Sequence, residues 1–305
     1  MPLHQIKNLL DAHAQRILSG DAFDAVNSLS ASMFDLRMGV EESQWRSACK
    51  PAIVSHQLYE VLDQDPYTGR ARRKPRGYAG DAVMLDYLYD REPPPDTTPL
   101  GREIFKSTVS SPGADAVRWR LQHVAGRIDS LQRSNRTVRC LSLACGHLRE
   151  AALSEAVRHR KAMIFAVDRD PRSLRVVSKK CSQFDVDTIC ASLLDILNGN
   201  ARFAHLDLAY AAGLFDYLSK PAAIALTAKL FSMLDFGGVV IVPNFLSRNP
   251  VRGYMESFMD WNLIVRSREE ILELGSAVPQ DGTCARRYYE DPFGVIGYLE
   301  LKKTG

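Results

Sequence analysis

Little in this 305-residue sequence suggests a membrane, an export signal or a nucleic-acid partner. No uncharged apolar run approaches ~20 residues, so we expect no membrane-spanning helix. Residues 1–5 lack a basic stretch followed by an apolar one, so we expect no signal peptide and a cytoplasmic location. The formal net charge of +3 is small and gives little support for nucleic-acid binding.

Metal and hydrolase motifs are also missing. None of the six cysteines forms a Cys-x-x-Cys pair, and no histidine cluster joins them at the spacing of metal ligands. We therefore expect reduced thiols and no metal site. Neither a His-Glu-x-x-His motif nor a Ser–His–Asp spacing is present, so the common metalloprotease and serine-hydrolase patterns find no match.

The sequence does contain enough apolar material, 46% of its residues, for a sizeable core. Residues 1–65 carry apolar side chains at helical spacing, and residues 6–17 place them on one face. The basic segment 67–78 contains glycine and proline and predicts a loop. After it, Asp81 is suited to cap a short helix, and a longer helix is predicted from about Ala114 to Arg133.

From about Asn135, apolar strands alternate with helical segments. The predicted strands are Thr137–Leu143, Ala162–Val167, Val186–Cys190, Leu206–Ala211, Gly238–Val242, Ala285–Tyr289 and Val295–Leu301. The alternation predicts an α/β fold with a mostly parallel sheet, and the last two strands predict an antiparallel terminal hairpin. We expect a helical N-terminal region over residues 1–133 and a nucleotide-binding α/β domain over residues 134–305.

The first predicted strand runs into a turn of small residues, Ala144, Cys145 and Gly146. Such a turn before a helix exposes backbone N–H groups and lets a ligand approach the main chain. With a single glycine it is also compatible with an ordinary strand–helix junction. The second strand favours a nucleotide-binding role for this turn. Asp168, followed by Arg169, stands at the end of that strand, about 20 residues beyond the turn.

An acidic residue placed like Asp168 binds ribose hydroxyls, or else caps the next helix, a role for which Asp170 is better suited. After the third strand, Leu193 or Leu194 is placed to pack on adenine and Asp195 to accept from its amino group. Asp195 is equally compatible with a solvated turn.

The later strands add to the same edge of the sheet. Ala212 and Gly213 stand at the carboxyl end of the fourth strand, where open α/β sheets bind their ligands. Asn244, at the end of the fifth strand, faces the same crevice and is suited to orient a substrate.

Several of these segments together resemble a known family. They are Arg76–Asp81, Ser142–Glu150, Ala212–Leu218, Asn244-Phe245 and Asp260-Trp261. The chain resembles, over about residues 65–303, bacterial class I methyltransferases known as extracellular-factor 3-hydroxypalmitic acid methyl ester biosynthesis proteins. The resemblance implies a Rossmann-like class I methyltransferase fold, S-adenosyl-L-methionine as cofactor, and methyl transfer to a small molecule such as a carboxylate or a thioether, in secondary metabolism.

The resemblance also implies roles for residues outside the nucleotide turn. Tyr78 and Asp81 lie in an expected lid and, with Asn244, are the candidate catalytic residues. The insertion after the fifth strand borders the acceptor in this architecture, so the expected substrate-binding residues are Tyr254, Asp260 and Trp261. Structural roles are also possible for these residues: core packing for the two aromatic side chains, and a salt bridge or helix cap for Asp260.

The turn departs from the usual class I pattern, because Ser142, Ala144 and Leu148 replace an acidic residue and glycines. Glu150, or the Tyr78–Asp81 loop, is then the candidate for holding the methionine end of the cofactor. The same departure leaves open cyclisation, aminocarboxypropyl transfer, or an inactive cofactor-binding partner protein.

Two further hypotheses concern macromolecular partners. The basic run from Arg70 to Arg76, flanked by Tyr67 and Tyr78, offers charge and stacking for a nucleic-acid methyltransferase, although a solvated loop explains it as well. The helical front is a candidate surface for a homodimer.

Overall fold

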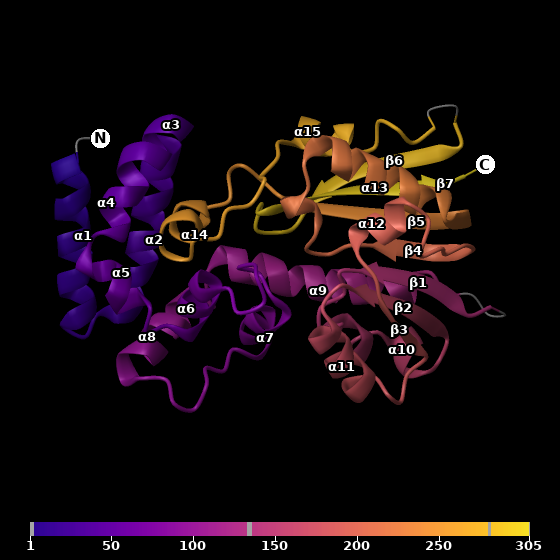
Figure 1. Cartoon of the computed structure of the whole chain (residues 1–305), viewed down its shortest axis with the longest axis horizontal. Coiled ribbons are helices and arrows are strands. Elements are labelled where there is room, and N and C mark those ends of the chain that lie inside the picture. The colour runs from indigo at the N-terminus through magenta and orange to yellow at the C-terminus, as the bar shows by residue number, and fades with distance from the viewer. Residues whose placement is uncertain (1–2, 133–135, 280–281, 305) are drawn as a thin grey trace. The chain divides into compact units, whose positions relative to one another are not determined.

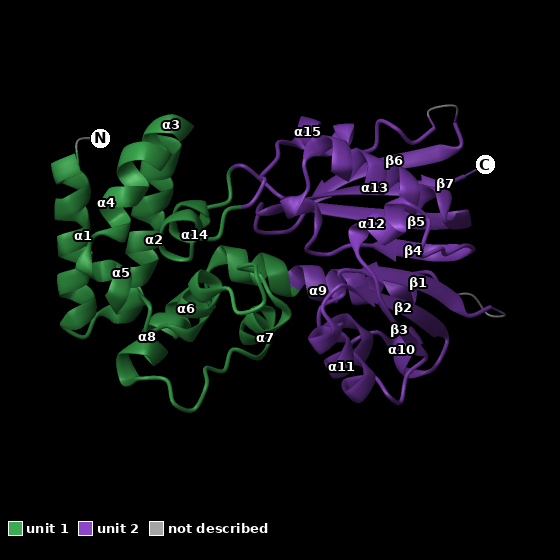
Figure 2. Ribbon diagram, viewed as in Figure 1, with its two compact units in different colours: residues 1–118, 248–262 green, residues 119–247, 263–305 purple. Residues whose placement is uncertain are grey.

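A computed structural model describes residues 3–132, 136–279 and 282–304. The chain forms two compact units, coloured separately in Figure 2: residues 1–118 with 248–262, and residues 119–247 with 263–305. The predicted domain boundary between residues 133 and 134 lies outside the described residues and stays a prediction. No helix in the described ranges is long and apolar enough to cross a membrane.

The regular secondary structure described in the first unit is all helical. Its helices are α1 (Leu3–Leu18), α2 (Ala22–Met38), α3 (Glu42–Gln44), the π-helical turn η1 (Trp45–Cys49), α4 (Lys50–Val54), α5 (Gln57–Leu62), α6 (Pro66–Arg73), α7 (Ala82–Asp90), α8 (Pro99–Thr108) and α14 (Arg252–Phe258). The predicted apolar face of α1 is confirmed, because Ile6, Leu10 and Ile17 are buried.

One part of the helical prediction was wrong. Residues 67–73, expected to belong to a loop, are part of α6 (Pro66–Arg73). Asp65 caps this helix by accepting the N–H groups of Tyr67 and Thr68, and Pro66 supplies the fixed φ of a first helical position. The capping prediction for Asp81 is confirmed, since its carboxylate accepts the Met84 N–H at 2.9 Å.

The second unit contains a seven-stranded sheet in the order β3-β2-β1-β4-β5-β7-β6 (Figure 1). The strands are β1 (Val138–Leu143), β2 (Ala162–Asp168), β3 (Val186–Cys190), β4 (Leu206–Tyr210), β5 (Leu234–Phe245), β6 (Cys284–Glu290) and β7 (Ile296–Lys303). Strands β1 to β5 pair in parallel, whereas β7 pairs antiparallel with β5 and β6. The predicted Rossmann-like α/β sheet with an antiparallel terminal hairpin, preceded by a helical region, is confirmed.

Helices cover both faces of this sheet. They are α9 (Pro112–Ser130), whose first residues belong to the other unit, η2 (Arg149–Ala152), α10 (Glu155–Arg158), α11 (Pro171–Lys180), α12 (Leu193–Leu197), η3 (Phe215–Tyr217), α13 (Lys220–Ser232) and α15 (Arg268–Glu273). Leu299 of β7 joins an apolar cluster with α13, whereas the next side chain, Tyr298, contacts Trp119 and His123 of α9. Because neighbouring strand residues point to opposite faces, α9 and α13 lie on opposite sides of the sheet.

Candidate active site

The turn after β1 has an unusual backbone. Ala144, Gly146 and Leu148 have φ values of 53°, 55° and 47°, so every second residue is left-handed. Two of the three carry a side chain, for which this conformation is unfavourable and is found mainly at functional sites. The Cys145 N–H donates to the Val167 carbonyl at 3.0 Å and fixes the turn to the end of β2.

Asp168 joins this turn to the end of β2. It is 5% exposed, and its carboxylate accepts the N–H groups of Gly146 at 2.9 Å and Asp170 at 2.8 Å. Asp170 caps α11 by accepting the Arg172 N–H at 3.0 Å, as predicted, so Asp168 is not needed for that role. Arg169, between them, is exposed.

After β3, two predicted adenine-binding residues differ in their surroundings. Leu194 is 66% exposed, which leaves an apolar side chain available beside the end of the strand. Asp195 belongs to a capping box of α12, in which its carboxylate accepts the N–H and hydroxyl of Ser192 at 2.9 and 2.7 Å. These hydrogen bonds lower the pKa of Asp195 and give it a local structural role.

Glu150, in η2 directly after the turn, is buried. Its carboxylate accepts the Tyr210 hydroxyl at 2.8 Å and the Ser142 hydroxyl at 3.5 Å. Burial raises the pKa of Glu150 above its usual range. The predicted cofactor residues after β1, β2, β3 and β4 therefore all lie at the carboxyl edge of the parallel strands.

Arg120, on α9, is a residue at this edge that the sequence analysis did not identify. It is 4% exposed, and a Cβ placed on Gly213 would lie 3.9 Å from its Nη2 atom. A signal was present in the sequence, because position 120 falls at helical spacing between Val117 and Val124 on the predicted inner face.

Asn244, predicted to orient a substrate, is completely buried in a polar network. Its Nδ2 donates to the Ile264 carbonyl at 3.0 Å, and its Oδ1 accepts from the Arg266 guanidinium. Arg266 also donates to the Phe215 carbonyl at 2.9 Å, and the nearby Asp216 carboxylate accepts the Phe245 N–H at 2.7 Å. The network ties the segment after β4 to the end of β5, and the substrate role of Asn244 stays a prediction.

Burial raises the pKa of Asp216 to about 6, above the ordinary value of 3.8. The folded state therefore holds this proton more tightly than the unfolded state. The corresponding stability is complete below about pH 4 and is lost as the pH rises to about 6. Between pH 4 and 8, this proton contributes at most about 3 kcal/mol to the decrease in the free energy of unfolding. We expect Asp216→Asn to remove that contribution. Urea unfolding between pH 4 and 8 measures it.

The Asn side chain keeps an acceptor for the Phe245 N–H, so the comparison isolates the charge. Asp187→Asn is the control, because Asp187 is exposed on β3. This variant should show the same dependence of stability on pH as the parent protein. An unchanged profile in Asp216→Asn would show that other groups cause the dependence.

The remaining predicted residues lie in the helical unit and have partners there. Asp81 is completely buried and pairs with Arg70 through two hydrogen bonds of 2.8 Å. Tyr254 is buried, with its hydroxyl 3.0 Å from the Thr68 hydroxyl.

Asp260 lies between Lys50 and Lys74, and hydrogen bonds from both amines outweigh its partial burial and lower its pKa to about 2. Trp261 is buried, and Tyr78 is partly buried in the segment between α6 and α7. These contacts fit packing and ion pairing, and the lid and acceptor roles stay predictions.

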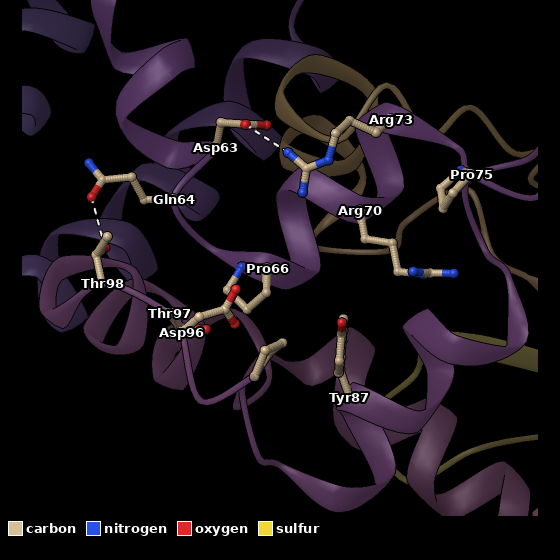
Figure 3. A pocket seen from close by; sticks show the side chains of 11 residues that line it. Asp63, Gln64, Pro66, Arg70, Arg73, Pro75, Tyr87, Asp96, Thr97 and Thr98 are labelled. Atoms are coloured by element: carbon tan, nitrogen blue, oxygen red, sulfur yellow. Dashed lines mark hydrogen bonds and ion pairs between the residues drawn. The ribbon is translucent and has the colours of Figure 1, made fainter.

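A cavity of about 420 Å³ lies within the helical unit (Figure 3). Arg70 and Arg73 of α6 and Tyr87 of α7 line it, together with Asp63 and Asp96. Both arginines have carboxylate partners, Asp81 and Asp63 respectively, so the lining carries balanced charges. None of the residues predicted to bind the cofactor or the substrate lines this cavity. Elsewhere in the described ranges, no three His, Cys, Asp or Glu side chains gather as metal ligands would.

No protein-family model matches the chain, and no curated protein matches it. Among solved structures, it is similar to a possible exported protein from Bordetella parapertussis, with 12% identity and a TM-score of 0.63 over 93% of this chain and 96% of that one. A TehB-like SAM-dependent methyltransferase from Corynebacterium glutamicum matches with 14% identity and a TM-score of 0.42, over 63% of this chain and 98% of that one.

A third similar structure is the 1,6-didemethyltoxoflavin-N1-methyltransferase from Burkholderia thailandensis, with bound S-adenosylhomocysteine. It has 14% identity and a TM-score of 0.43 over 61% of this chain and 79% of that one. Of these three structures, the Bordetella protein has a TM-score high enough to show a shared fold, which extends over nearly the whole chain. The finer resemblance to the 3-hydroxypalmitic acid methyl ester family receives no support from these matches.

Proposed function

We propose that this chain is an S-adenosyl-L-methionine-dependent methyltransferase that acts on a small molecule. A fold alone does not define an activity, so the proposal depends on the site. The observation that carries it is the hydrogen bond between Asp168 and the left-handed turn at Gly146, at the carboxyl edge of the sheet. Open α/β sheets bind nucleotides at this edge, with an acidic residue after the second strand on the ribose.

The residues at this edge have the chemistry that the cofactor requires. Asp168 offers carboxylate oxygens to ribose hydroxyls, and the exposed Leu194 offers an apolar surface to adenine. Glu150 offers a buried carboxylate to the ammonium group of the methionine end. When bound, S-adenosylmethionine supplies an activated methyl group, so the chain has to bind, orient the acceptor and exclude water.

For the acceptor we propose a small carboxylate or a thioether, in line with the resemblance described above. Neither acceptor has to lose a proton to attack the methyl group, so neither needs a general base. We further propose that the enzyme works in the cytoplasm, in secondary metabolism.

The nucleic-acid alternative loses support from the ion pairs of the basic run. Arg70 pairs with Asp81, Arg73 with Asp63, and Lys74 with Asp260. Arg72 donates to the Phe258 carbonyl and stacks on Tyr59, 3.4 Å from the ring centroid. Charges that are neutralised within the chain contribute little to phosphate binding, because that binding depends on releasing counterions from the nucleic acid.

Product analysis tests the proposal. The purified chain is incubated with S-adenosylmethionine, alone and with a panel of small carboxylic acids and thioethers. Formation of S-adenosylhomocysteine only when an acceptor is present supports methyl transfer. Formation of methylthioadenosine without an acceptor would instead support cyclisation or aminocarboxypropyl chemistry. No binding of S-adenosylhomocysteine by calorimetry would overturn the cofactor assignment.

A further inference from the structure

Arg120 is a largely buried cation for which no hydrogen bond to another described residue is found. It is 4% exposed, and among the described residues its guanidinium donates no hydrogen bond. A guanidinium carries five N–H donors, and donors that the described chain does not use are available to a ligand.

A second donor near Arg120 is also unpartnered. The Tyr298 hydroxyl is completely buried and has no hydrogen-bond partner among the described residues. The charge of Arg120 acts on Tyr298 and also on two buried carboxyl groups, Glu150 and Asp216. Unpaired donors and buried acidic groups therefore occur in one region, a combination that suits a ligand bearing both a carboxylate and an ammonium group.

Arg120 approaches the backbone at Gly213. Apart from Gly213 itself and its two chain neighbours, a Cβ built on Gly213 would meet one described atom within 4 Å, the Nη2 atom of Arg120 at 3.9 Å. That separation is an ordinary van der Waals contact. Gly213 stands after β4, at the same edge as Asp168 and the left-handed turn.

We propose that Arg120 and Tyr298 bind the carboxylate of the cofactor's aminocarboxypropyl group, while Glu150 faces its ammonium group. This inference rests on the proposed function, since it names the residues that would hold one end of the same cofactor. In this arrangement a cation on α9 takes the role of the acidic residue and glycines that the turn lacks. The carboxylate of an acceptor acid has the same chemistry, and the experiment separates the two sources.

Calorimetry with two ligands tests the assignment. S-adenosylhomocysteine carries the aminocarboxypropyl group, whereas methylthioadenosine lacks it. We expect Arg120→Met to weaken binding of S-adenosylhomocysteine about 30-fold, because charge-assisted hydrogen bonds are lost. Binding of methylthioadenosine should stay within about twofold of the parent protein, since its adenosine contacts are intact. Arg120→Lys keeps the charge without the planar fork. Its affinity for S-adenosylhomocysteine should lie between those of the parent protein and Arg120→Met.

Tyr298→Phe is the second variant. Its hydroxyl has no partner in the chain, so the melting temperature should not fall, while S-adenosylhomocysteine should bind about fivefold more weakly. Unchanged S-adenosylhomocysteine binding by Arg120→Met would overturn the assignment and point to an acceptor acid. Equal losses for both ligands would overturn it as well, by indicating a collapsed site. If the parent protein binds neither ligand, the proposed function itself fails.

Discussion

Replacing Asp168 with alanine is expected to weaken binding of S-adenosylhomocysteine about 100-fold. Two hydrogen bonds from ribose hydroxyls to a carboxylate contribute together about 3 kcal/mol, which corresponds to this factor. The substitution also removes the acceptor of the Gly146 N–H, so the left-handed turn loses its attachment to β2. Both effects act in the same direction, and calorimetric titration of the purified variant measures their sum.

Asp170→Ala is the matched control, two residues along the chain. It removes the cap of α11 and should lower the free energy of unfolding by about 1 kcal/mol. Its carboxylate is directed to the Arg172 N–H, so affinity for S-adenosylhomocysteine should change less than twofold. If Asp168→Ala binds as tightly as Asp170→Ala, Asp168 does not hold the ribose and its role is confined to the turn.

The strands of this fold were predictable because each is a short apolar segment bounded by turn residues. The predicted strand at residues 186–190 coincides with β3, and the predicted hairpin coincides with β6 and β7 to within one or two residues at each end. β5 is longer than predicted, since it runs from Leu234 to Phe245, whereas the predicted strand covers Gly238–Val242. Local sequence thus identified the elements better than it identified their ends.

Features that depend on distant residues were harder to predict. The basic composition of residues 67–78 concealed α6, whose start is set by Asp65 and Pro66 just outside that window. Arg120 was overlooked because a charged residue on an apolar helix face gains its meaning from contacts elsewhere in the chain, such as Gly213. Asp195 carried a local signal, since Ser192 three residues earlier is typical of a capping box.

Replacing Gly253 with alanine is expected to destabilise the helical unit by about 3 kcal/mol or more. Gly253 lies on α14, where a Cβ would come within 2.1 Å of the Met33 carbonyl oxygen and 2.8 Å of the Phe34 nitrogen on α2. Both are backbone atoms, which cannot rotate away, so the helices have to separate. That separation strains the buried ion pair between Arg37 and Glu256, whose Nε and Oε2 atoms lie 2.7 Å apart.

Thermal unfolding followed by circular dichroism measures this loss, expected as a melting temperature lower by about 10 °C. Gly126→Ala is the control, because a Cβ at Gly126 meets no described atom within 4 Å and the residue lies within α9. There the substitution replaces a poor helix former by the best one and should stabilise the chain by about 0.5–1 kcal/mol. The two variants add the same methyl group, so opposite signs would isolate the close approach of α14 to α2. A Gly253→Ala protein as stable as its parent would mean that the backbones are farther apart than the contact at Met33 indicates.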